Sequence, residues 1–170
     1  MKKAYGKSET VKRLSPRPAR SERSLMIFVA ADKHGFKVIK YVEGYLKAHS
    51  LEFVNLGVKT ETEDMKLENM IPQVVTKVRE NEDNKAILSC GTGVGVAVGA
   101  NKFRGIRACL TTTPQIAEWS VVYDNCNVLC LSGWGSDKAT VYKILDAWFN
   151  AKYDGNKERS KMIAALDTWH

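Results

Sequence analysis

The chain has 170 residues, an apolar fraction of 44% and a net charge of +7. This length suits one domain with a full hydrophobic core better than two domains. We expect no membrane span, because no apolar run approaches the roughly 18 residues required, and no secretory signal, because no apolar stretch follows the basic N-terminus.

The first part of the chain is a basic leader. Residues 1–23 carry eight basic and two acidic side chains, a net charge of +6, which leaves about +1 for the rest. Large apolar residues are few there, and Pro16 and Pro18 lie within it, so we predict an unstructured, solvated leader over residues 1–24 and one domain over 25–170. An organelle transit peptide is the alternative, opposed by Glu9 and Glu22. We expect no nucleic-acid partner, because the domain has no comparable basic cluster.

Short apolar runs and helical patterns alternate along the rest of the chain. The predicted strands are 26–31, 52–56, 86–90, 107–110 and 127–131. The predicted helices are 36–48, 70–79 with Pro72 in the first turn, 94–101, 114–122 capped by Thr113, one from Ser136 or Asp137 to 150, and 157–169. This alternation predicts an α/β fold, a single doubly wound, Rossmann-like domain with a five-stranded parallel sheet flanked by helices. Ligands of such folds bind at the carboxyl ends of the strands.

The four cysteines are Cys90, Cys109, Cys126 and Cys130. A chain of this size needs no disulfide framework, and the cysteines form no C-x-x-C pair, so we predict a reducing, cytoplasmic location. Cys126 and Cys130 have a spacing seen in metal sites, but no second Cys or His pair follows them. We therefore interpret them as buried strand residues and expect no metal.

A glycine-rich loop is the most informative segment. Cys90 ends a predicted strand, and Gly91, Thr92, Gly93, Val94 and Gly95 lead from it into a helix. Glycines allow close backbone approach, and the amides of a helix N-terminus stabilise negative charge, so the loop is expected to hold a phosphate or a developing oxyanion.

Two nucleotide-binding interpretations of this loop fail. The spacing is not G-x-G-x-x-G, and no acidic residue ends the next strand, which argues against NAD. The Walker pattern G-x-x-x-x-G-K-[ST] is absent. Cys90 beside amide dipoles is expected to ionise readily and to react, but it is equally well interpreted as a buried packing residue, and the glycine spacing alone does not choose between the two.

The loop and its flanks resemble the ribose-5-phosphate isomerase B family and its galactose-6-phosphate isomerase relatives. The resemblance follows the family signature from Ser89 to Leu110 and includes Asp32 with Gly35 in the first loop. It covers residues 25–161. It implies an aldose–ketose isomerisation of a phosphorylated sugar through an enediolate, with no cofactor.

The resemblance also implies a role for particular residues. Cys90 is the expected base, Gly91 to Gly95 hold the oxyanion, Thr92 assists ring opening, and Asp32 contacts sugar hydroxyls. The expected substrate shell further includes Lys33, His34, Val94, Asn101, Asp124, Trp134, Lys157 and Lys161. The resemblance implies a homodimer or higher homo-oligomer with sites at the interface between subunits.

Several positions depart from the family pattern. Lys33 stands where the family has histidine, with His34 one place later; Tyr123 replaces the ring-opening histidine; and Trp134 replaces a phosphate-binding arginine. Lys157 and Lys161 stand in for two arginines and are also interpretable as a solvated helix end. The rival hypothesis is therefore a weak or inactive homologue that binds sugar phosphates as one subunit of an oligomer. An indole stacks on sugar C–H groups but cannot neutralise a dianion, and a phenol has an ordinary pKa of about 10. We therefore expect an already open substrate, such as a tetrose phosphate, to be preferred.

Overall fold

The computed structural model describes residues 25–169, so the predicted leader at 1–24 lies outside the described residues. The strands are β1 (Ile27–Ala31), β2 (Phe53–Asn55), β3 (Lys85–Cys90), β4 (Ala108–Leu110) and β5 (Val128–Ser132). The helices are α1 (Phe36–Ala48), α2 (Leu67–Arg79), α3 (Val94–Ala100), α4 (Pro114–Val122), α5 (Lys138–Asn150) and α6 (Lys157–Leu166).

The five strands form one parallel sheet in the order β2-β1-β3-β5-β4, which confirms the predicted fold class. Register places the carboxyl ends of the three central strands side by side. Ala31 of β1 lies opposite Ser89 of β3, and Cys90 lies opposite Ser132 of β5. The loops that follow these strands therefore emerge together at one edge of the sheet.

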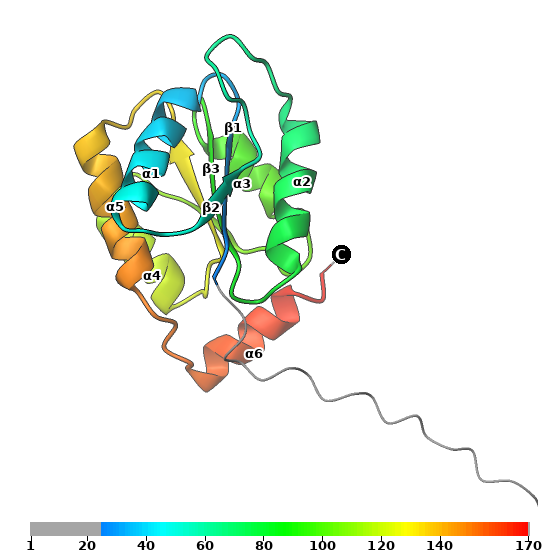
Figure 1. Cartoon of the computed structure of the whole chain (residues 1–170). Helices are drawn as coiled ribbons and strands as arrows, with labels where there is room; N and C mark the ends of the chain where they lie inside the picture. The colour runs from blue at the N-terminus through cyan, green and yellow to red at the C-terminus, as the bar shows by residue number, and fades with distance from the viewer. Residues whose placement is uncertain (1–24, 170) are drawn as a thin grey trace, which may run out of the picture.

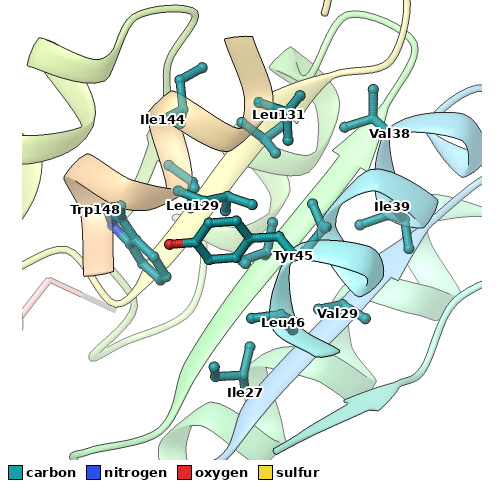
Figure 2. Close-up of a cluster of buried hydrophobic side chains, with 14 of the residues drawn as sticks. Ile27, Val29, Val38, Ile39, Tyr45, Leu46, Leu129, Leu131, Ile144 and Trp148 are labelled. Carbon is teal, nitrogen blue, oxygen red and sulfur yellow. The ribbon is translucent and has the colours of Figure 1, made fainter. Parts of the chain in front are cut away.

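Helices cover both faces of the sheet. Helices α1, α4 and α5 pack on one face and α2 and α3 on the other (Figure 1). Strand residues alternate between the two resulting cores: Ile27 and Leu129 point into the first core, drawn in Figure 2 with Trp148, whereas Leu88 points into the second. Each fully buried Ile or Leu contributes about 1.5–3 kcal/mol to stability. A sheet anchored on both faces holds its carboxyl edge rigidly.

Helix α6 lies at the opposite edge, where the strands begin, below the sheet in Figure 1. It begins at an Asn156 cap, whose Oδ1 accepts hydrogen bonds from the amides of Glu158 and Arg159. An ion pair of 3.4 Å joins Asp167, just after the helix, to Arg107, just before β4.

Most predicted boundaries hold within two residues, but three predictions are wrong. Helix α2 begins at Leu67, so Pro72 lies in its interior and leaves the carbonyl of Glu68 without its helical donor. Helix α6 ends at Leu166. Cys126 is buried in the turn before β5 rather than in a strand. Its amide donates a hydrogen bond to the carbonyl of Ser120 in α4, so it does not pair with a neighbouring strand.

Candidate active site

The thiol of Cys90 lies at the carboxyl end of β3, beside the first turn of α3. The residue is 5% exposed. Gly93 caps α3 with a φ of 78°, a left-handed conformation that glycine adopts without strain. A Cβ built on Gly95 would lie 3.8 Å from the Cys90 Sγ, so the glycine keeps the helix backbone close to the thiol. This geometry brings the positive end of α3 to the sulfur.

The loop after β5 is fastened to the glycine loop. The amide of Gly133 donates to the carbonyl of Cys90 at 2.9 Å, and the amide of Trp134 donates to the carbonyl of Gly91 at 3.0 Å. The hydroxyl of Ser132 donates to the same Gly91 carbonyl at 3.1 Å. These bonds engage the carbonyls of Cys90 and Gly91 and hold the loop after β5 against the glycine loop.

The first loop packs against the same strand end. Asp32 Oδ1 accepts hydrogen bonds from the amides of His34 at 3.0 Å and Gly35 at 2.9 Å, so this oxygen stabilises the turn that Asp32 begins. Lys33 lies 3.8 Å from Asp64 across the entrance. A hollow of about 320 Å³ adjoins the loop and is lined by Lys33, His34, Phe36, Lys37 and Glu61. A carboxylate accepts hydrogen bonds from hydroxyl groups, whereas the hollow with Lys33 and Lys37 suits the charged end of an anionic ligand.

The other three thiols have raised pKa values. Burial raises the pKa of Cys126 to about 12, and it raises the pKa values of Cys109 and Cys130 as well. Their thiolates are therefore scarce near neutral pH. All four cysteines are free, and Cys90 is the one that lies at the glycine loop.

A second group of expected site residues lies at the opposite edge of the sheet. Tyr123 caps the C-terminus of α4 and is 42% exposed, and Asp124 follows it. Lys157 begins α6, and Lys161 pairs with Glu158 at 2.9 Å. The central strands have five or six residues, so this group lies about 15 Å from Cys90 within one chain.

Arg159 is the residue of this second group that sequence analysis missed. Its guanidinium lies 4.9 Å from the ring centroid of Tyr123 and pairs with Asp154. The amide of Asp154 donates to the carbonyl of Val122, which brings the start of α6 against the end of α4. Its position in the last helix, between Lys157 and Lys161, was the available signal. The family resemblance instead implied Lys157 and Lys161 at the positions of the two family arginines.

Asn101 has a structural role. Its side chain exchanges two hydrogen bonds of 2.8 Å with the backbone of Ala108, joining the end of α3 to the start of β4. Both ends of the amide are used, and Asn101 lies one helix length from the glycine loop. The structure therefore does not bring it to the other expected ligands.

Two further features are absent from the described residues. Among residues 25–169, no three His, Cys, Asp or Glu side chains are placed to hold a metal ion. Within the same range, no helix has the length and apolar character needed to cross a bilayer.

The carboxyl edge thus combines a thiol, a glycine loop and a carboxylate on an α/β fold, a set of groups suited to an enzyme of proton-transfer chemistry. The family model described as Ribose/Galactose Isomerase matches residues 27–165, and the chain belongs to this family.

Individual relatives agree with this family. A probable ribose-5-phosphate isomerase B from Mycoplasma genitalium is 33% identical over 140 residues, covering 82% of this chain and 92% of the relative. A 4-deoxy-4-sulfo-D-erythrose isomerase from a Clostridium species is 30% identical over 110 residues, covering 65% of this chain and 69% of the relative. The structure of ribose-5-phosphate isomerase B from Mycoplasma genitalium with bound ribulose-5-phosphate has a TM-score of 0.80 at 32% identity, covering 86% of this chain and 96% of that one.

Proposed function

We propose that this protein interconverts an aldose and a ketose that carry a phosphate group, of the ribose 5-phosphate and ribulose 5-phosphate type, without a cofactor. The observation that carries the proposal is the Cys90 thiol beside the amides of α3, in a chain that matches the isomerase family over residues 27–165. The bound ribulose-5-phosphate of the Mycoplasma genitalium relative supports the same substrate class.

Cys90 is the proposed base. Its thiolate takes the proton from the carbon next to the carbonyl of the open sugar, and the electron pair of that C–H bond forms the double bond of the enediolate. The carbonyl oxygen becomes an oxyanion, which the amides from Gly91 to Gly95 stabilise. The thiol then returns the proton to the neighbouring carbon, while a proton passes between the two oxygens. Asp32 orients the hydroxyls and Thr92 assists ring opening.

We propose that a homodimer completes each site. Tyr123, Asp124, Arg159, Lys157 and Lys161 lie too far from Cys90 to act on the same substrate within one chain, and a second copy supplies them. Apolar side chains exposed on α3 and α4 support such an interface; they are Val94, Val98, Ile116 and Trp119. In this arrangement Tyr123 exchanges the ring-opening proton, with the charge of Arg159 over its ring.

Mixed subunits test this arrangement. With ribose 5-phosphate, a cyclic substrate that needs ring opening, Cys90→Ala and Tyr123→Phe should each abolish most turnover, Cys90→Ala more completely. Random exchange of the two variants makes half of the dimers mixed, and each mixed dimer holds one intact site of two, so about a quarter of wild-type activity should return. Activity that stays at the level of the separate variants after exchange would place both residues in one chain's site or outside any site.

The second candidate function is a catalytically weak subunit that binds sugar phosphates. The observations that favour it are Tyr123 and Trp134, which replace a proton-transferring and a phosphate-binding residue of the family. A coupled assay against four-, five- and six-carbon sugar phosphates separates the two functions. Turnover that disappears in Cys90→Ala supports the isomerase, and binding without turnover supports the alternative.

We further propose that an already open, four-carbon substrate is preferred to ribose 5-phosphate. A phenol exchanges protons near neutral pH less readily than the imidazole that the family has at this position, so with Tyr123 there ring opening limits cyclic substrates. The name of the four-carbon sulfo-sugar isomerase from Clostridium supports this size class. The comparison of kcat/KM for erythrose 4-phosphate and ribose 5-phosphate tests it, and a clear preference for ribose 5-phosphate would defeat it.

The cysteines bear on the cellular compartment of the protein. Four free cysteines in the described residues favour a reducing environment, and we propose the cytoplasm. Localisation of the tagged full-length chain tests this, with export or import into an organelle as the contrary result.

A further inference from the structure

Trp134 is the most exposed large apolar side chain in residues 25–169, and it lies in the loop after β5, packed against the glycine loop. It is 69% exposed. A Cβ built on Gly91 would lie 2.5–2.9 Å from three atoms of its six-membered ring, so the indole covers the Cα of the residue after Cys90. A tryptophan presents about 150–250 Å² of surface, so most of a large apolar surface faces solvent over the backbone of the glycine loop.

The position of this indole is fixed by its neighbours. Its own amide bonds the carbonyl of Gly91, and its ring meets the ring of His34 in an edge contact, with centroids 5.7 Å apart. The preceding Gly133 has the carbonyl oxygen of His34 at 2.1 Å from its built Cβ, so the backbone is clamped against the first loop. A surface held in this way binds without losing much conformational freedom.

An indole face offers dispersion contacts to C–H groups and a single N–H, but no positive charge. Two cations of this edge, Lys33 and Lys37, line the hollow beside His34, and Trp134 is not part of its lining. A sugar phosphate that reaches Cys90 therefore meets two different surfaces. Its carbon chain can lie on the indole, and its charged end has to be held elsewhere.

We propose that Trp134 is a specificity-determining residue that binds the carbon chain of the substrate by stacking and takes no part in binding the anion. This inference rests on the proposed isomerase function. The indole then selects among ligands, because the binding free energy from this contact increases with the C–H surface that the ligand packs against the ring.

Binding measurements in a chain that cannot turn over test the proposal. In the Cys90→Ala background, calorimetry would compare ribose 5-phosphate, erythrose 4-phosphate and inorganic phosphate, which has no carbon chain. Trp134→Ala should weaken both sugar phosphates about 3- to 10-fold, the effect of losing an aromatic contact, and leave inorganic phosphate within twofold. Trp134→Phe should retain most of the sugar affinity. Trp169→Ala, a similarly exposed tryptophan just after α6, is the matched control and should change none of the constants.

Three results would overturn the proposal. Equal weakening of phosphate and sugar phosphates would make Trp134 part of the anion site. Unchanged sugar affinity in Trp134→Ala would remove it from the site while leaving the isomerase function intact. A change of oligomeric state in Trp134→Ala, seen by light scattering, would make the indole a contact between copies. If the Cys90→Ala chain binds no sugar phosphate at all, the proposed function itself fails.

Discussion

Gly133→Ala is expected to inactivate the enzyme with little loss of fold. Gly133 lies where the loop after β5 passes the first loop, and a built Cβ would lie 2.1 Å from the carbonyl oxygen of His34 and 2.9 Å from the Cα of Gly35. The φ angle of Gly133 is not positive, so the effect is steric alone. Both contacts are with backbone, which cannot move aside by a change of side-chain rotamer.

The size of the effect follows from these distances. Real Cβ atoms essentially never approach other atoms within 3.0 Å, so the two loops have to separate by about 1 Å. Overpacking of this kind costs about 1–3 kcal/mol of stability. Because the same loops hold Trp134, the carbonyl of Cys90 and Asp32, and because a misplacement of 1 Å costs on the order of 100-fold in rate, kcat/KM should fall about 100-fold.

Steady-state kinetics and thermal unfolding would measure the two effects separately. The melting temperature should fall by about 2–4 °C for each kcal/mol lost. Gly135→Ala is the matched control, because its built Cβ has Ser132 Oγ at 3.7 Å as the nearest atom, and both quantities should stay near those of the wild type. Activity within twofold of wild type in Gly133→Ala, or an equal loss in Gly135→Ala, would refute the idea that the contact between these loops positions the site.

Three further predictions concern the leader, the thiols and the free energy of unfolding at acid pH. Deletion of residues 1–22 should leave melting temperature and activity nearly unchanged, and a loss of folding or dimerisation would contradict this. Brief iodoacetamide treatment followed by mass spectrometry should find Cys90 alkylated before the three thiols whose pKa values burial raises. Glu43→Gln should lower the free energy of unfolding at pH 7 by about 1.5–3 kcal/mol and should have a smaller effect below pH 4. Burial alone would raise the pKa of Glu43, but hydrogen bonds from Lys40 and Asn55 lower it from the ordinary 4.5, so the stability that the carboxylate contributes is lost as pH falls through the folded pKa. Urea titrations at several pH values measure this, and an equal loss at pH 3 and pH 7 would count against it.

The elements with local signals were predictable from the sequence. Apolar spacing marks α1, and the Thr113 cap with Pro114 marks the start of α4, where the structure shows the Thr113 hydroxyl accepting the amide of Ile116. The start of α2 was not predictable in this way. Its N-cap, Lys66, makes no side-chain capping bond, so the first clear cue along the chain is Pro72, five residues too late.

Part of the candidate site was also predictable from the sequence, and part was not. The three loops at the carboxyl edge follow from strand direction alone, and the family resemblance drawn from the glycine loop is confirmed by the family match. The contact of Trp134 with Gly91 and that of Arg159 with Tyr123 depend on side-chain packing between segments about 40 residues apart in sequence. No local pattern encodes such contacts, which is why Arg159 was missed.

The strand order has a consequence for how the chain acquires its structure during synthesis. β5 lies between β3 and β4, so β4 has no strand to pair with until the chain has been made as far as Ser132. A chain released earlier would expose β3 as an open edge, with the glycine loop at its end and no β5 loop to hold it. Pairings between distant segments form slowly and leave unpaired edges prone to aggregation. The glycine loop is thus held in place only after β5 has been made, although its own residues are synthesised about 40 positions earlier.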